Sequence, residues 1–142
     1  MKLPTAAALG LALILPSVSL AAGPEGTWLS QDGGTKVRVS DCGGKLCGTV
    51  VWLNSPTDPE TGKPRTDKRN PDPAKRARPL IGLRVVNGLL PNGPNRWSGI
   101  VYNADDGHTY NVSLRVDGTR TATLQGCLLK VLCRGEHWTR AN

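Results

Sequence analysis

Two closely spaced pairs of cysteines constrain the fold of this chain more than any other feature. Cys42 and Cys47 form one pair, and Cys127 and Cys133 form the other. Strand-like sequence flanks each pair on both sides, which predicts two β-hairpins that are cross-linked close to their turns. Four cysteines allow three pairings, and the hairpin pattern favours Cys42–Cys47 with Cys127–Cys133. Zinc is the less favoured alternative, because both spacings are wider than those of most structural zinc sites.

The beginning of the chain has the pattern of an export signal. Lys2 supplies a positive charge, residues 6–15 are almost uninterrupted apolar sequence, and small residues follow around Ala21 and Ala22. The apolar stretch is much shorter than the roughly 20 residues of a membrane-spanning helix. We therefore expect a signal peptide at residues 1–22, cleaved near Ala21 or Ala22, and a periplasmic or secreted protein without a membrane span. Such an oxidising compartment favours disulfide bonds.

The remainder, residues 23–142, has the size of a single domain. Apolar and polar residues alternate along residues 110–116, and Asp117-Gly118 follows as a turn signal. Similar short runs recur without a convincing helix, and about eight strands are predicted, at residues 26–29, 36–39, 49–53, 80–90, 97–102, 110–116, 119–125 and 134–140. This all-β pattern favours an eight-stranded antiparallel up-and-down barrel, which is the smallest barrel that holds a small ligand. A β-sandwich is the alternative.

One long stretch, residues 55–79, interrupts the strand pattern. It holds six of the 11 prolines of the chain, which exclude a central strand. The formal net charge of the chain is +7, and most of the excess comes from residues 61–84, which overlap this stretch and hold eight basic residues against only Asp67 and Asp72: Lys63, Arg65, Lys68, Arg69, Lys75, Arg76, Arg78 and Arg84. We expect a long Pro-rich basic loop that is either a solvated excursion or a lid over a binding site.

Residues suited to catalysis are few. His108 and His137 each lie in a predicted strand, and neither has a partner that the sequence identifies. No G-x-S-x-G, H-E-x-x-H, phosphate-binding or dinucleotide-binding motif occurs. Asp105-Asp106-Gly107 is typical of a turn rather than of a metal site. The sequence therefore predicts no catalytic residue, cofactor or metal, and favours a binding role over an enzyme.

The first and last predicted strands carry a matched pair of residues. They are neighbours in an eight-stranded barrel, so Arg140 can lie across the indole ring of Trp28. A guanidinium over a Trp face contributes about 0.5–2 kcal/mol. A Gly-x-Trp start with a late Arg resembles the pattern of lipocalins and the wider calycin group. In that resemblance the pair closes the bottom of the barrel and has no catalytic role.

Motifs along the whole domain point to a narrower family. They are C-G-G-K-L-C-G at 42–48, W-L at 52–53, N-P-D-P at 70–73, R-P-L-I-G-L at 78–83, W-S-G-I-V-Y at 97–102, D-G-H-T-Y at 106–110 and W-T-R at 138–140. Together they resemble a family of exported bacterial proteins known as domain of unknown function 2147 (DUF2147). The resemblance spans nearly all of residues 26–140. It implies a lipocalin-like barrel in the cell envelope and no particular reaction.

These observations favour an exported protein that binds a small amphipathic or anionic ligand. Arginines would meet the charge of such a ligand and aromatic residues would line an apolar wall. The candidate ligand-binding residues are Arg76, Arg78, Arg84, Trp52, Trp97 and Tyr102. The alternative is an interaction or inhibitor module whose basic loop docks on an acidic protein or an anionic envelope polymer. Export argues against nucleic acid as the partner.

Overall fold

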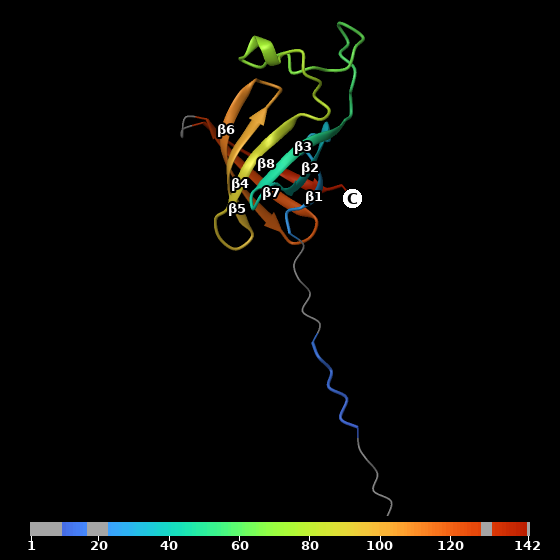
Figure 1. The fold of residues 1–142 in the computed structure, drawn as a ribbon, viewed down its shortest axis with the longest axis vertical. Coiled ribbons are helices and arrows are strands. Elements are labelled where there is room, and N and C mark those ends of the chain that lie inside the picture. The colour runs from blue at the N-terminus through green and yellow to red at the C-terminus, as the bar shows by residue number, and fades with distance from the viewer. Residues whose placement is uncertain (1–9, 17–22, 129–131, 142) are drawn as a thin grey trace, which may run out of the picture.

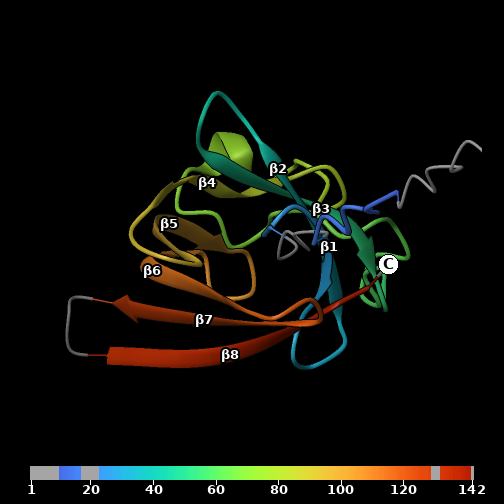
Figure 2. The same cartoon turned by 90° about the horizontal axis from the view of Figure 1, so that it is seen from below.

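The structure, a computed structural model, describes residues 10–16, 23–128 and 132–141. Eight antiparallel strands form a closed barrel in chain order (Figures 1 and 2). The strands are β1 (Gly26–Leu29), β2 (Thr35–Asp41), β3 (Leu46–Leu53), β4 (Arg84–Pro91), β5 (Arg96–Asn103), β6 (His108–Asp117), β7 (Thr121–Leu128) and β8 (Leu132–Arg140). The predicted up-and-down barrel is thus confirmed. The signal-peptide prediction falls mainly on residues 1–9 and 17–22, which lie outside the described residues, and stays a prediction.

Side chains alternate along the strands between the interior of the barrel and its outer surface. On β6, Val112, Leu114 and Val116 are buried, whereas the residues between them are exposed. A strand places successive side chains on opposite faces, so this pattern turns every second residue toward the core. The buried cluster is mostly aliphatic and consists of Trp28, Val37, Val39, Leu46, Val50, Leu83, Val85, Val86, Leu89, Val112, Leu114, Val116, Ala122, Leu124 and Trp138.

One end of the barrel is closed by the contact between β1 and β8. Trp28 and Arg140 are register partners, and the Arg140 guanidinium lies 4.3 Å from the centroid of the Trp28 ring. The same guanidinium donates hydrogen bonds to the backbone carbonyls of Thr119, Glu25 and Gly23 at 2.7, 2.7 and 2.8 Å. Arg140, on the last strand, therefore connects the β6–β7 turn with the residues that precede β1.

Two disulfide bonds join neighbouring strands at opposite ends of the barrel. Cys42–Cys47 spans the β2–β3 turn at the closed end. Cys127–Cys133 links β7 to β8 at the other end, where the two cysteines are direct cross-strand partners. Each bond therefore staples one hairpin close to its turn, and neither connects strands that are distant in the sequence.

The connection between β3 and β4, residues 54–83, departs from the simple meander. It contains two isolated bridges, Thr57–Pro64 and Thr66–Pro79, and one short 3₁₀ helix, η1 (Pro73–Lys75). Figure 1 shows this segment, in green, above the end of the barrel that is far from the N-terminal chain. The predicted strand at 80–90 begins too early. Gly82 has a φ of +94° and turns the chain, so β4 starts only at Arg84.

Candidate functional site

A cavity of about 520 Å³ lies in the barrel at the end opposite the Trp28–Arg140 contact. Its walls are the inward faces of most strands, and Leu80 of the 54–83 segment adds to them. The apolar lining consists of Val37, Val50, Leu53, Leu80, Val85, Val101, Ala104, Val112, Leu124 and Trp138. Pockets for small molecules commonly measure about 300–1,000 Å³ and are mostly apolar. The size and lining therefore fit a small organic molecule.

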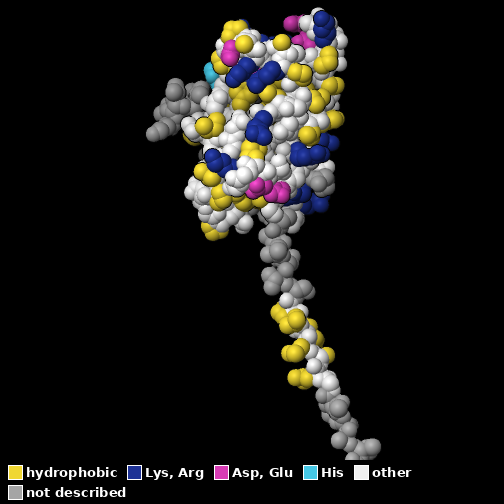
Figure 3. Space-filling model, in the orientation of Figure 1, with side chains coloured by type: hydrophobic (Ala, Val, Ile, Leu, Met, Phe, Trp, Pro, Cys, Tyr) yellow, Lys and Arg dark blue, Asp and Glu magenta, His cyan; other side chains and the backbone are white. Residues whose placement is uncertain are grey.

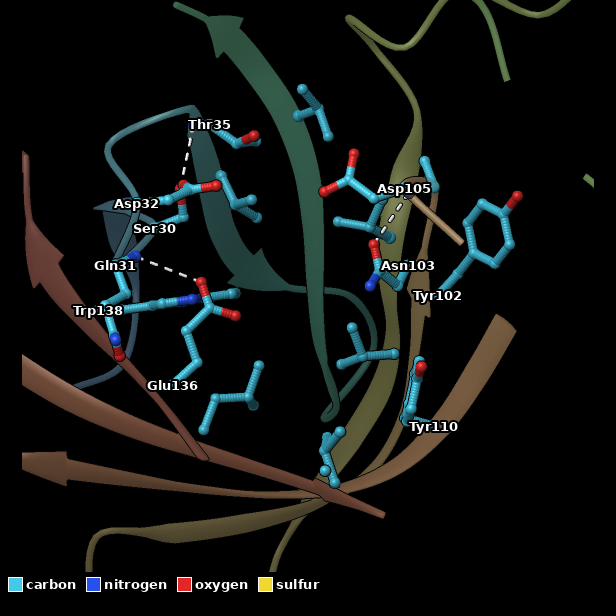
Figure 4. Close-up of a pocket in the computed structure, with 18 of the residues that line it drawn as sticks. Ser30, Gln31, Asp32, Thr35, Tyr102, Asn103, Asp105, Tyr110, Glu136 and Trp138 are labelled. Carbon is cyan, nitrogen blue, oxygen red and sulfur yellow. Dashed lines mark hydrogen bonds between the residues drawn. The ribbon is translucent and has the colours of Figure 1, made fainter. Parts of the chain in front are cut away.

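Polar side chains gather at the mouth of this cavity. Asp32 comes from the β1–β2 turn, Asp105 from the β5–β6 turn, and Arg134 and Glu136 from β8. In Figure 4 the side chains of Glu136 and Asp105 extend into the space from opposite sides. One Glu136 oxygen accepts a hydrogen bond from the backbone N–H of Gln31 at 3.2 Å. The mouth thus offers charged groups above an apolar chamber.

The Asp32 carboxylate is engaged by its own turn. The hydroxyl of Ser30 donates to it at 2.6 Å and the backbone N–H of Gly34 donates at 2.8 Å. These hydrogen bonds, the one from Ser30 above all, hold the pKa of the Asp32 carboxyl below its usual value. Asp32 is therefore ionised at neutral pH, and its main role is to fix the shape of the β1–β2 turn.

A buried carboxylate attaches the 54–83 segment to the barrel beside the cavity. Asp67 is 0% exposed and accepts hydrogen bonds from the Tyr102 hydroxyl at 2.6 Å, from Arg78 Nη2 at 2.8 Å and from Asn70 Nδ2 at 2.8 Å. Burial raises the pKa of the Asp67 carboxyl, but these three hydrogen bonds outweigh it, and the pKa lies below its usual value. Burial and the hydrogen bond to Asp67 raise the pKa of Tyr102 to about 12. Tyr102 therefore stays protonated and donates to a charged acceptor.

A second contact seats the segment on the β5–β6 turn. Arg69 donates through Nη1 to the backbone carbonyl of Asp105. Gly107 has a φ of +73°, and a Cβ atom added there would lie 2.0 Å from the Arg69 carbonyl oxygen. Only glycine allows this approach. The hydroxyl of Tyr110 donates to Asp106 in the same turn, which raises the pKa of Tyr110. Residues 54–83 thus form a fixed strap at the cavity rather than a detached excursion.

The three predicted arginines lie outside the lining of the cavity. Arg78 is engaged in the ion pair with Asp67 at 2.8 Å. Arg76 is exposed, and its Nε donates to the backbone carbonyl of Asn70 at 2.7 Å. Arg84 is exposed at the start of β4. Because Arg76 and Arg78 hold the strap together, they serve its structure in the arrangement seen here.

The predicted aromatic residues are dispersed. Tyr102 is among the lining residues, although its hydroxyl is directed to Asp67. Trp52 is 38% exposed on the outer surface, where Lys36 Nζ lies 4.7 Å from the centroid of its ring. Trp97 is half-buried and packs against the core without lining the cavity. Of the six candidates, therefore, only Tyr102 borders the cavity.

The lining residues Asp105, Glu136 and Trp138 were not identified as a site from the sequence. A signal for two of them was present, because Glu136 and Trp138 are two positions apart in a predicted strand and so share one face. His108 and His137 are exposed and lie outside the lining. Within the described ranges, no group of three or more His, Cys, Asp or Glu residues is placed to hold a metal ion. The described part of the chain also lacks a helix with the length and hydropathy to cross a membrane.

Comparison with known proteins places this geometry in a family. A comparison with curated proteins gave no match. Among solved structures, the Helicobacter pylori protein HP1028, described as belonging to the lipocalin family, matches with a TM-score of 0.69 and 22% identity, over 83% of this chain and 82% of that one. This likeness shows a lipocalin-like barrel. The family described as "Uncharacterized protein conserved in bacteria (DUF2147)" matches residues 26–140, so the chain belongs to the DUF2147 family.

Proposed function

We propose that this protein binds a small amphipathic molecule inside its barrel. The observation that carries the proposal is the cavity of about 520 Å³, which has apolar walls and a polar mouth and lies opposite a closed barrel end. An apolar chamber with a few polar groups is the usual form of a small-molecule site. The apolar part of the ligand would lie among Val101, Val112 and Leu124, and its polar part would remain at the mouth.

The cell envelope is the place that fits this function best. The two disulfide bonds, Cys42–Cys47 and Cys127–Cys133, leave no free cysteine in the described residues and suit an oxidising compartment. The family is bacterial, and the first residues of the chain have the pattern of an export signal. A binding barrel in the periplasm would carry or sequester a molecule that passes between membranes.

Binding of a neutral fluorescent apolar probe, N-phenyl-1-naphthylamine, tests this proposal. Val101 lines the cavity, whereas the preceding residue on β5, Ile100, is 44% exposed on the outer surface. Val101→Trp should fill the cavity and weaken probe binding at least tenfold. Ile100→Trp adds the same side chain outside the barrel and should leave binding within about twofold. Equal effects of the two variants, or no probe binding by the folded wild type, would contradict the proposal.

An interaction module is a second candidate because several cations of the strap region remain unpaired. Lys63, Lys75 and Arg84 are exposed and make no ion pair with any described residue. Lys and Arg side chains are spread over the face shown in Figure 3. Such a surface would attract an acidic protein or an anionic polymer. The test is the retention of the Val101→Trp variant, which should no longer bind the probe, on an anionic matrix. Retention that falls steeply as the salt concentration rises would favour this role.

A further inference from the structure

We infer that the ligand of the cavity has a cationic head group, such as a protonated amine, which Asp105 and Glu136 hold at the mouth. This inference rests on the proposed function and adds to it the chemical class of the ligand. It reverses the expectation of an anionic ligand, which depended on Arg76, Arg78 and Arg84. Those three arginines lie outside the lining.

The charge of the cavity is opposite in sign to that of the chain. The chain as a whole has a formal net charge of +7. By formal charge, the lining holds three acidic side chains, Asp32, Asp105 and Glu136, and one basic side chain, Arg134, which gives an excess of two negative charges. A cleft lined by one sign of charge attracts ligands of the opposite sign. An anionic head group would instead meet two carboxylates that face the same space.

Asp105 and Glu136 have acceptor capacity that the protein does not use. Asp105 is exposed, and no described residue donates a hydrogen bond to its carboxylate; Arg69 contacts the Asp105 backbone carbonyl. Glu136 accepts one hydrogen bond, from the Gln31 backbone, through one oxygen. An ionised carboxylate has room for about four donors. An ammonium group, with its three donors, would supply what these two side chains lack.

The wall next to Glu136 provides an independent sign of a missing ligand. Trp138 is 7% exposed, lines the cavity, and lies beside Glu136 in Figure 4. Its indole N–H is buried and has no hydrogen-bond partner among the described residues. A buried donor without a partner destabilises the fold, so such groups need an explanation. An oxygen acceptor on the ligand would satisfy this N–H, and the indole face would favour a nearby cation.

Displacement of the fluorescent probe by three amphipaths with one alkyl chain tests the inference. Decylamine, which is protonated at pH 7, should displace the probe at a concentration at least tenfold lower than decanoate, with decanol between them. Glu136→Gln and Asp105→Asn should each weaken the binding of decylamine several-fold and leave the binding of decanol nearly unchanged. Arg134→Gln removes a positive charge from the lining and should strengthen the binding of decylamine.

The matched control is Glu60→Gln. The Glu60 side chain is 81% exposed on the strap and outside the lining, and this variant changes the net charge by the same amount as Glu136→Gln. Equal weakening by the two variants would show a general charge effect and overturn the inference. Probe binding with no preference for decylamine over decanoate would overturn it too, while leaving the proposed function intact. Failure of the probe and all three amphipaths to bind the folded protein would overturn the proposed function itself.

Discussion

The two ends of this barrel satisfy their polar groups in different ways. At the closed end, the Arg140 guanidinium covers Trp28, which is 2% exposed, and donates to three backbone carbonyls. In the cavity, the exposed Asp105 carboxylate and the buried indole N–H of Trp138 have no hydrogen-bond partner among the described residues. The comparison shows one end whose polar groups are paired within the protein, and a cavity that keeps two polar groups without a partner among the described residues.

The strap takes an intermediate position between these ends. It is seated at the open end, yet its central carboxylate, Asp67, has as many hydrogen-bond donors as the guanidinium of Arg140 has acceptors. Only Leu80 of the strap contributes to the apolar wall of the cavity. The strap is therefore held by the polar contacts of Asp67 together with the apolar contacts of Leu80 and Leu83, which join the core at its C-terminal end.

The largest effect is expected from breaking the closed end. Arg140→Ala removes three charge-assisted hydrogen bonds and a cation–π contact, and should lower the free energy of unfolding by about 3 kcal/mol. For a domain of this size the melting temperature should fall by about 10 °C. Thermal unfolding followed by circular dichroism measures both quantities. Arg115→Ala is the control, since Arg115 pairs only with the partly exposed Asp117 and such a pair contributes about 0–1 kcal/mol. An equal loss of unfolding free energy in the two variants would show that Arg140 stabilises the barrel no more than an ordinary surface arginine does.

A smaller effect is expected at the strap. Asp67→Asn keeps the shape of the side chain but removes the negative charge of the group to which Arg78 and Tyr102 donate hydrogen bonds. The substitution should lower the free energy of unfolding by about 2 kcal/mol at pH 7. The Glu60→Gln variant of the same segment should cost much less, because the Glu60 side chain is 81% exposed. Urea unfolding of the two variants measures the difference.

The cost of Asp67→Asn should depend on pH. The pKa of Asp67 is lower in the folded protein than its usual value of about 4, so the folded state favours the ionised form. The stability from this group is complete above the usual value and is lost as the pH falls through the folded pKa. Wild type and Asp67→Asn should therefore converge in acid. A constant difference down to low pH would mean that packing, and not charge, accounts for the loss.

The smallest effect is expected at the exposed cation–π pair. Lys36 lies over Trp52, as Arg140 lies over Trp28, but Trp52 is 38% exposed and Trp28 is 2% exposed. An exposed pair contributes only about 0.5–1 kcal/mol. Lys36→Ala should therefore lower the free energy of unfolding by about 0.5 kcal/mol in urea titration. A loss close to that of Arg140→Ala would show that burial does not set the strength of these pairs.

The barrel itself could be predicted from the sequence because its determinants are local. Alternation along residues 110–116, turn signals such as Asp117-Gly118 and two short cysteine spacings each describe one hairpin. Antiparallel neighbours joined by short turns then leave few possible topologies. The up-and-down topology could therefore be predicted without information on contacts between residues that are distant in the sequence.

The cavity mouth could not be predicted in the same way because its residues come from separate elements. Asp105 lies in a turn of common sequence, and Glu136 of β8 lines the same cavity only because the barrel closes. The sequence leaves the basic residues of the strap free for a ligand, but in the structure Arg78 binds the Asp67 carboxylate, and Arg65 and Arg76 donate to the backbone carbonyls of Ser55 and Asn70. The burial of Asp67 depends on contact with Tyr102, which is 35 positions away in the sequence.

The pairing of the first strand with the last has a consequence for the order of events in biosynthesis. Arg140 bonds to the carbonyl of Glu25, 115 positions earlier, and β1 contacts β8. The ring of strands therefore cannot be completed until the chain has emerged as far as residue 140. Until then β1 has only β2 as a partner and its other edge is unpaired. A nascent chain arrested before residue 132 would lack β8 and should be a substrate for holding chaperones and proteases, whereas the released chain should not.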